Sequence, residues 1–256
     1  MQHFFKKSLG QHFLINKSIL KKIVSIKDIR DKIIFEIGPG QGALTKEILQ
    51  NKPKKLILIE KDKNLRSNLL KLQEKFKETI SYICDDILNV NLKDFNYNKI
   101  QVISNLPYNI ASTLIIRLII DFDIVESMVL MVQKEVAERL SAKVSTPYYS
   151  RISVLIQLHA FVEKVFEVEP HNFNPKPKVK STVIKITPYR KKKKIYDKLD
   201  SILKISFRQR RKTIKNNLKT FYFDAEKKIL ECGIDPNSRP QDLEPNDFVK
   251  LTKVLI

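Results

Sequence analysis

The fold is decided by the stretch IIFEIGPGQGALTKEILQ, residues 33–50. Its first six residues are rich in β-branched side chains and end in a glycine turn, which is typical of a buried strand. The residues after the glycines, ALTKEILQN (43–51), carry their apolar side chains at helical spacing. A buried strand that passes through a glycine turn into a helix predicts the start of an α/β sheet.

The same alternation of apolar strands and amphipathic helices continues along the chain. Further strands are predicted at 55–60, 79–84, 100–105 and 127–133, and helices at 63–76, 111–121 and 135–142. This pattern predicts a doubly wound, Rossmann-like sheet of parallel strands that is covered on both faces. Two last strands, 152–165 and 182–187, have hairpin-like spacing, so we expect the sheet to end in an antiparallel strand.

The chain carries a large excess of positive charge. Its 256 residues include 48 Lys and Arg against 28 Asp and Glu, which gives a formal net charge of +20. Residues 176–219 hold 17 of the basic residues and only two acids, Asp197 and Asp200. Charge of this density neutralises phosphates and predicts binding to nucleic acid. The alternative is a proteome that is rich in Lys throughout.

A shift in composition marks the predicted domain boundary. Helical patterns follow Pro188 and the basic run RKKKK (190–194) up to the end of the chain. We therefore predict a cofactor-binding domain of residues 1–188 and a small basic helical domain of residues 189–256.

Several function classes lack their signatures in this sequence. Cys84 and Cys232 form no CxxC motif and the four His show no ligand spacing, so neither a metal site nor a disulfide framework is predicted. The N-terminus lacks the apolar run of a signal peptide, and the most apolar stretch, 114–120, is short and interrupted by Arg117. We therefore expect a cytoplasmic protein without a membrane span.

The glycine turn has the features of a site for an adenosine-containing cofactor. Gly38 and Gly40 let the backbone turn tightly and approach a ligand closely. Glu60, at the end of the second strand, can accept hydrogen bonds from both ribose hydroxyls. The GxGxG spacing and the negative charge of Glu36 suit a cationic ligand better than a diphosphate. These residues predict binding of S-adenosylmethionine rather than NAD.

The third strand ends in two acidic residues, Asp85 and Asp86. Asp86 is predicted to accept a hydrogen bond from the exocyclic amine of the cofactor adenine. The alternative is an N-cap for the residues from Ile87 onward. Asp85 is expected to be solvated.

Four residues after the fourth strand, Asn105, Leu106, Pro107 and Tyr108, suggest methyl transfer to adenine. The N6 amine of adenine is a poor nucleophile because its lone pair is delocalised into the ring. The Asn105 side-chain oxygen and the Leu106 carbonyl can accept its two hydrogens and favour a pyramidal nitrogen, while Pro107 fixes the backbone. Tyr108 is expected to stack on the adenine face. The alternative is a plain strand-end turn with a half-buried tyrosine.

A second aromatic side chain, Phe173, is a candidate wall for a flipped-out base. It lies in the loop NFNP (172–175), where proline would keep it in a rigid position. The alternative is simple core packing between the last two strands.

Six segments together resemble one known family. They are KSLGQHFL (7–14), EIGPG (36–40), NLPYN (105–109), FNPKPKVKS (173–181), FRQRRKTIKNNL (207–218) and RPQDL (239–243). They run in order through nearly the whole chain and resemble the ribosomal RNA adenine N6,N6-dimethyltransferase family of the small-subunit type. The resemblance implies a methyltransferase sheet followed by a small helical domain.

The resemblance also implies contacts with the cofactor. His12 and Leu14 match positions that approach it, largely through backbone groups, and His12 stands where many relatives carry Asn. By the same implication, four residues line the cofactor pocket: Gly38, Glu60, Asp86 and Asn105.

The segment 207–218 is predicted to form a basic helix. Five of its side chains are expected to clamp phosphates: Arg208, Arg210, Arg211, Lys212 and Lys215. Phe207, Ile214 and Leu218 would lie on the opposite, core-facing side. The alternative is a solvated basic face. The resemblance implies that this segment helps to position the enzyme on the ribosomal subunit.

These features lead to one hypothesis and two rivals. The hypothesis is methyl transfer from S-adenosylmethionine to N6 of two adjacent adenosines near the 3′ end of small-subunit (16S) rRNA, by a monomer that acts on the subunit or its precursor. One rival is a large-subunit rRNA dimethyltransferase of the macrolide-resistance type, and mapping the modified nucleotide separates the two. The other is a non-catalytic RNA-binding or assembly factor, which undetectable binding of S-adenosylmethionine would favour.

Overall fold

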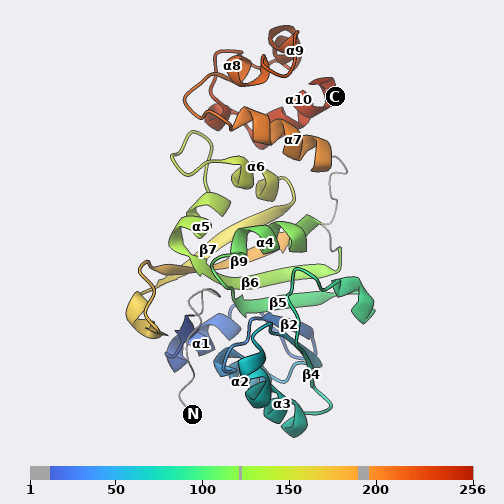
Figure 1. Cartoon of the computed structure of the whole chain (residues 1–256), viewed down its shortest axis with the longest axis vertical. Coiled ribbons are helices and arrows are strands. Elements are labelled where there is room, and N and C mark those ends of the chain that lie inside the picture. The colour runs from blue at the N-terminus through green and yellow to red at the C-terminus, as the bar shows by residue number, and fades with distance from the viewer. Residues whose placement is uncertain (1–11, 121–122, 190–195, 256) are drawn as a thin grey trace. The chain divides into compact units, whose positions relative to one another are not determined.

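The computed structural model describes residues 12–120, 123–189 and 196–255 (Figure 1). Two stretches singled out in the sequence lie outside the described residues. They are residues 7–11 of the N-terminal motif and the basic run 190–194.

The central element is a sheet of seven strands in the order β4-β3-β2-β5-β6-β9-β7. Its strands are β2 (Ile33–Ile37), β3 (Lys55–Ile59), β4 (Ile80–Ile83), β5 (Ile100–Asn105), β6 (Val125–Gln133), β7 (Ala160–Val168) and β9 (Ser181–Pro188). The strands from β4 to β6 are parallel to their neighbours, and β9 pairs with β6 antiparallel. The predicted doubly wound sheet with an antiparallel last strand is therefore confirmed.

The direction of winding determines where ligands bind. From β2 the chain passes through α2 (Ala43–Gln50) and α3 (Arg66–Lys75) toward one edge, and from β5 through α4 (Ala111–Ile120) toward the other. Because such crossovers are right-handed, the two sets of helices cover opposite faces of the sheet. The carboxyl ends of β2 and β5 meet at this change of direction, which is where open α/β sheets bind ligands.

A small antiparallel ribbon ties the N-terminal segment to a distant loop. In β1 (Phe13–Leu14) and β8 (Phe173–Asn174), Phe13 pairs with Asn174 and Leu14 pairs with Phe173. The helix α1 (Lys17–Val24) follows β1, and the side chain of Asn16 caps its first turn. Sequence patterns did not predict this ribbon, because two-residue strands are too short for an alternating pattern.

One predicted strand is wrong over its first half. Residues 151–157 form the helix α6 (Arg151–Gln157), and β7 begins only at Ala160. Ser150 and Ser153 form a capping box that starts the helix. A short buried apolar run such as RISVLIQ fits a strand or a helix equally well, so periodicity alone could not decide between them.

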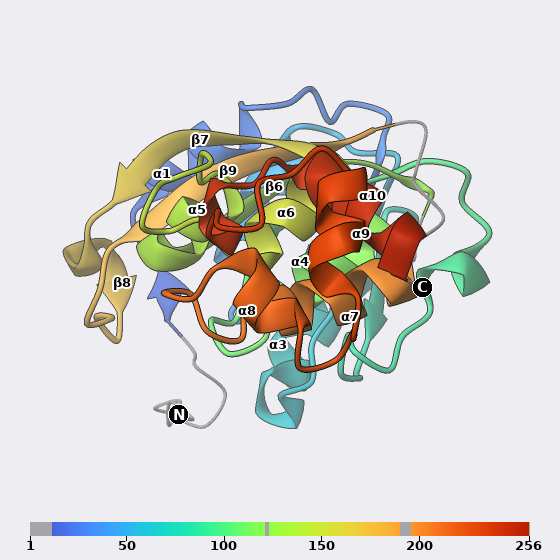
Figure 2. The same ribbon diagram turned by 90° about the horizontal axis from the view of Figure 1, so that it is seen from above.

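The chain forms two compact units. One consists of residues 1–137 and 162–188, and the other of residues 138–161 and 189–256. The second unit includes α6 and four further helices, which gather side by side in Figure 2: α7 (Tyr196–Ser206), α8 (Ile214–Leu218), α9 (Ala225–Glu231) and α10 (Pro245–Leu255). Residues 138–161 belong here partly because the Tyr149 hydroxyl donates to the Leu243 carbonyl at 3.0 Å. None of the helices within the described ranges is both long and apolar enough for a membrane crossing.

Candidate functional site

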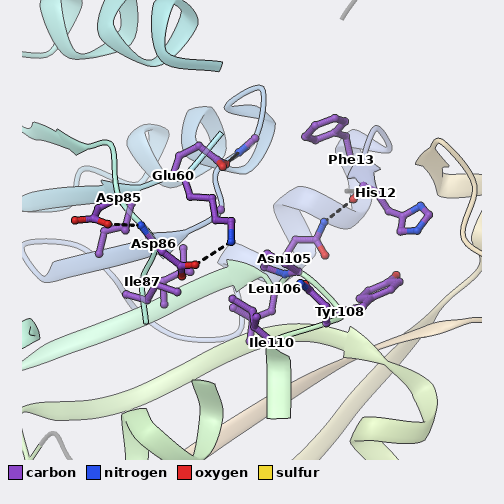
Figure 3. A pocket seen from close by; sticks show the side chains of 17 residues that line it. His12, Phe13, Glu60, Asp85, Asp86, Ile87, Asn105, Leu106, Tyr108 and Ile110 are labelled. Atoms are coloured by element: carbon purple, nitrogen blue, oxygen red, sulfur yellow. Dashed lines mark hydrogen bonds and ion pairs between the residues drawn. The ribbon is translucent and has the colours of Figure 1, made fainter. Parts of the chain in front are cut away.

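A pocket lies at the carboxyl ends of the parallel strands in the first unit (Figure 3). It encloses an empty volume of about 710 Å³, part of it open to solvent, which is ample for a nucleoside-sized ligand. Six residues predicted for the cofactor line it: His12, Gly38, Gly40, Glu60, Asp86 and Asn105. The loop residues Leu106, Pro107 and Tyr108 line it as well.

The glycine turn after β2 needs its glycines for conformation and for space. Gly38, Gly40 and Gly42 have φ of 64°, 60° and 78°, in the left-handed region that other residues rarely adopt. A Cβ on Gly40 would lie only 2.5 Å from the ring of Phe13. The N-terminal segment therefore packs directly on the turn.

Glu60 lies at the end of β3 and connects two parts of the pocket wall. Its carboxylate accepts hydrogen bonds from the backbone N–H of Gly40 at 3.2 Å and of Asp62 at 2.8 Å. Burial raises the pKa of Glu60. The two oxygens have four lone pairs between them, so these bonds leave acceptor capacity for a ribose hydroxyl.

Glu36 lies deeper, on β2, and is 1% exposed. It borders a second cavity, and Phe13, Gly38 and Asn105 line both cavities. Thr45 Oγ1 donates to its carboxylate at 2.7 Å. Burial raises the pKa of Glu36 to about 8 because it disfavours the ionised form. A cation bound nearby would stabilise the ionised form and lower this pKa.

Asp86 fits both interpretations of the sequence. It accepts a hydrogen bond from the backbone N–H of Leu88 at 3.0 Å, as a cap would, and it also lines the pocket. Lys61 Nζ lies 2.8 Å from the Asp86 carboxylate, and this contact lowers the pKa of Asp86 (Figure 3). Lys61 and Ile87 were not predicted to line the pocket, although each adjoins a predicted acid in the sequence.

Asn105 has the most informative hydrogen bonds in the pocket. Its amide nitrogen donates to the His12 carbonyl oxygen at 2.8 Å (Figure 3). Because a carbonyl can only accept, this bond fixes which end of the amide faces the pocket. The side-chain oxygen is buried and has no hydrogen-bond partner among the described residues. A buried acceptor without a partner is costly unless a ligand satisfies it.

Tyr108 is held at both its hydroxyl and its ring. The hydroxyl lies 2.6 Å from Ser181 Oγ, and burial raises the pKa of the phenol. The ring stacks on that of His12, with centroids 5.3 Å apart and planes 29° apart. The aromatic pair thus forms one side of the pocket next to Asn105 (Figure 3).

Phe173 and Leu14 lie in the core next to the pocket. Phe173 is 1% exposed and belongs to the same apolar cluster as Leu14. Phe173 is not among the residues that line either cavity, whereas Leu14 lines the second one. This placement favours the core-packing alternative for Phe173.

The basic segment of the second unit is a turn followed by a short helix. The predicted helix is wrong over residues 207–212, because α7 ends at Ser206 and α8 begins only at Ile214. The core-facing positions Ile214 and Leu218 are buried as expected.

The five predicted phosphate-binding side chains differ in their surroundings. Arg210 donates to the carbonyl oxygens of Pro147 at 2.7 Å and Tyr149 at 3.0 Å. Lys215 forms an ion pair of 3.0 Å with Glu226, and Arg208 lies over the ring of Phe221. The remaining two, Arg211 and Lys212, are exposed.

Sequence reasoning missed Asn217, which shapes this turn. Asn217 is 5% exposed and its amide nitrogen lies 3.1–3.3 Å from the carbonyls of Gln209, Lys212 and Thr213. Its side-chain oxygen accepts from the N–H of Gln209 at 3.1 Å. The sequence offered one signal for a buried role of Asn217, namely its position directly before the predicted core residue Leu218.

No group of three or more His, Cys, Asp or Glu within the described ranges is arranged to hold a metal ion. The two cavities together contain the buried carboxylates of Glu60 and Glu36, left-handed glycines and the unpartnered amide oxygen of Asn105, and these groups suit a nucleoside with a cationic group.

Comparisons with known proteins agree on one family. The profile described as ribosomal RNA adenine dimethylase matches residues 2–256. The chain is 42% identical to the ribosomal RNA small subunit methyltransferase A of Pelagibacter ubique, over 97% of this chain and 95% of that protein.

Two solved structures share the fold. A dimethyladenosine transferase from Plasmodium falciparum is 30% identical with a TM-score of 0.79, and covers 94% of this chain and 96% of its own. The 23S rRNA methyltransferase ErmE is 20% identical with a TM-score of 0.70, and covers 95% of this chain and 99% of its own. The second likeness concerns the fold alone.

Proposed function

The chain belongs to the ribosomal RNA adenine dimethylase family, and from this premise we propose the reaction and its site. The protein transfers methyl groups from S-adenosylmethionine to N6 of two adjacent adenosines near the 3′ end of small-subunit rRNA. The free side-chain oxygen of Asn105 carries the proposal, because it provides a hydrogen-bond acceptor in a pocket otherwise suited to an adenosine cofactor.

Asn105 acts on the amine of the target adenine. Its oxygen accepts one N6 hydrogen and the Leu106 carbonyl accepts the other, which draws the nitrogen toward a pyramidal geometry and localises its lone pair. The hydrogen bond to the His12 carbonyl holds the amide in this orientation in advance. Tyr108 offers a ring for the base to stack on. No strong general base is needed, because N6 becomes positively charged when it takes the methyl group and then readily releases a proton to water.

The cofactor residues divide between the two cavities. Glu60 accepts bonds from the ribose, and Asp86 accepts one from the cofactor adenine. Glu36, beside the second cavity, stabilises the positive charge of the cofactor. When bound, S-adenosylmethionine supplies a methyl group on a cationic sulfur.

The second unit binds the RNA backbone through part of its basic turn. Arg211 and Lys212 are exposed and make the main phosphate contacts, and Arg208 contributes from its place over Phe221. Arg210 and Lys215 instead support the turn through their protein contacts. We further propose that the protein works as a monomer in the cytoplasm, on the small subunit or its precursor.

A labelling assay tests the proposal. Methyl-labelled S-adenosylmethionine is incubated with precursor small subunits and either the wild-type protein or Asn105→Ala. We expect labelled dimethyladenosine near the 3′ end of the small-subunit rRNA with the wild type only. Equal incorporation by both proteins would refute the role of Asn105, and label in large-subunit rRNA would refute the proposed substrate. Undetectable cofactor binding by the wild type would point to a non-catalytic assembly factor.

A further inference from the structure

The turn of residues 86–90, which follows β4, forms part of the pocket wall although it belongs to no helix or strand. Asp86 and Ile87 line the pocket from this turn. Inside the turn, the backbone N–H of Asn89 donates to the Asp86 carbonyl at 2.8 Å, and that of Val90 donates to the Ile87 carbonyl at 3.2 Å. A turn with so few hydrogen bonds of its own opens easily unless other parts of the chain hold it.

One arginine from a distant part of the chain holds this turn. Arg117 lies in α4, inside the apolar stretch 114–120. Its Nη1 donates to the carbonyl oxygens of Ile87, at 3.0 Å, and Leu88, and its Nη2 donates to that of Val90 at 3.0 Å. A guanidinium is suited to this task because it is planar and presents several donors in a fixed geometry.

The helix α4 is a firm support for Arg117. Leu114, Ile115 and Leu118, which flank it, are buried in the core. The helix begins at Ala111, shortly after the catalytic loop at the end of β5. In the sheet, β3 and β2 separate β4 from β5, so strand pairing does not join the two segments directly. Arg117 therefore ties the turn after β4 to the helix that follows the catalytic loop.

The same turn determines where the Asp86 carboxylate lies. This carboxylate accepts a hydrogen bond from the backbone N–H of Leu88 at 3.0 Å, and the carbonyl of Leu88 accepts from Arg117. On its other side the carboxylate lies 2.8 Å from Lys61 Nζ (Figure 3). A shift of the Leu88 backbone would therefore move the acceptor that Asp86 presents to the pocket.

We propose that Arg117 is a positioning residue for cofactor binding, which holds the turn 86–90 in the shape that presents Asp86 and Ile87 to the cofactor adenine. This inference rests on the proposed hydrogen bond from the adenine amine to Asp86. Arg117 is not among the residues that line the pocket, so it acts through the backbone of the turn.

The main consequence concerns the recognition of the adenine amine. A hydrogen bond to a charged acceptor contributes about tenfold or more to affinity, provided that the acceptor is held in place. Without the Arg117 guanidinium the turn adopts other shapes, and the Asp86 carboxylate no longer favours a ligand that carries the amine. A purely structural role of Arg117 would change stability and leave this preference intact.

The test compares two ligands by calorimetry with the full-length protein. They are S-adenosylhomocysteine and S-inosylhomocysteine, in which an oxo group replaces the adenine amine. The wild type should bind the adenine compound about tenfold more tightly. In Arg117→Met, which keeps a long side chain, the Kd of the adenine compound should rise about tenfold and that of the inosine compound less than about twofold. Thr113→Ala is the matched control, since Thr113 is exposed on the same helix and lies outside the pocket.

Two further measurements separate positioning from stability. Arg117→Lys keeps the charge but presents one nitrogen in place of a planar fork, so its preference for the adenine compound should lie between those of the wild type and Arg117→Met. Hydrogen exchange at the amides of Asn89 and Val90 should be faster in Arg117→Met, because their bonds within the turn open more often.

The outcomes distinguish this inference from the proposed function. The inference is overturned if the folded Arg117 variants keep the wild-type preference, or if they lose affinity for both compounds by the same factor. Should Arg117→Met fail to fold, the preference of Arg117→Lys decides in the same way. A wild-type protein that prefers the adenine compound but does not methylate small-subunit rRNA would refute the proposed function alone. Equal binding of both compounds by the wild type would refute the proposed role of Asp86 and this inference with it.

Discussion

Two asparagine side chains, Asn105 in the pocket and Asn217 in the turn of residues 207–213, each bind backbone groups, but they differ in whether their side-chain oxygens have a hydrogen-bond partner. Asn105 donates to the His12 carbonyl and leaves a buried oxygen without a partner. The Asn217 nitrogen is near three carbonyls and its oxygen accepts from a backbone N–H. One amide keeps a free acceptor for a ligand, and the other is fully used by the protein.

This difference suggests that the Asn105 side chain can bind a ligand, whereas the Asn217 side chain holds the backbone in place. A buried polar atom without a partner lowers stability and is retained where a ligand can pair with it. A fully bonded amide stabilises one backbone conformation and has no free donor or acceptor for a ligand. We therefore expect substitution of Asn105 to affect activity more than stability, and substitution of Asn217 to do the reverse.

The largest effect is expected for Asn105→Ala. Loss of one preorganised hydrogen-bonding group from a transition state commonly costs about 100-fold or more in kcat. The melting temperature should change little, because the protein loses a single hydrogen bond to the His12 carbonyl. Single-turnover methylation and a thermal melt measure the two quantities. A large drop in melting temperature with normal activity would reverse the assigned roles.

The next effect is a loss of stability in Asn217→Ala. Several backbone groups of the turn lose their partner, which should lower the free energy of unfolding by about 2 kcal/mol. Denaturant unfolding gives this value, and the binding constant for S-adenosylmethionine should remain that of the wild type. The neighbouring Asn216→Ala serves as the control, since only its backbone N–H, which the substitution retains, takes part in the cap from Thr213.

The same comparison shows what sequence alone can predict. The sequence placed Glu60 and Asn105 near each other because the carboxyl ends of parallel strands meet at one edge of the sheet, and both residues do line one pocket. The contact of His12 with Asn105 was not predictable, because it depends on a ribbon whose two strands are far apart in the sequence.

The prediction of a helix over the basic turn, residues 207–212, was wrong for a related reason. Helical spacing predicted a helix through residues 207–212, whereas the Asn217 amide takes up backbone carbonyls there and α8 starts later. A side chain that competes for backbone groups overrides local propensity, and this competition becomes visible only in three dimensions.

A smaller effect concerns the pH dependence of cofactor binding through Glu36. Its pKa of about 8 means that the carboxyl group is largely protonated at pH 6.5 and ionised at pH 8.5 in the ligand-free protein. A cationic ligand favours the ionised form, so affinity should rise with pH, by about tenfold over this interval, and level off above pH 8. Calorimetry at several pH values measures this rise. In Glu36→Gln the rise should disappear, and an unchanged profile would exclude Glu36 as its origin.

The smallest effect distinguishes two adjacent arginines in the basic turn. Arg211→Ala removes an exposed cation, so RNA affinity should fall only a few-fold and the slope of log K against log salt should decrease by about 1.

Arg210→Ala removes two bonds to backbone carbonyls and should lower the free energy of unfolding by about 1–2 kcal/mol. Its salt slope should stay near the wild-type value, provided that the turn still forms. Titrations with a small-subunit rRNA fragment between about 50 and 200 mM salt compare the slopes. Equal slope changes in both variants would mean that Arg210 also leaves its carbonyl partners to bind phosphate.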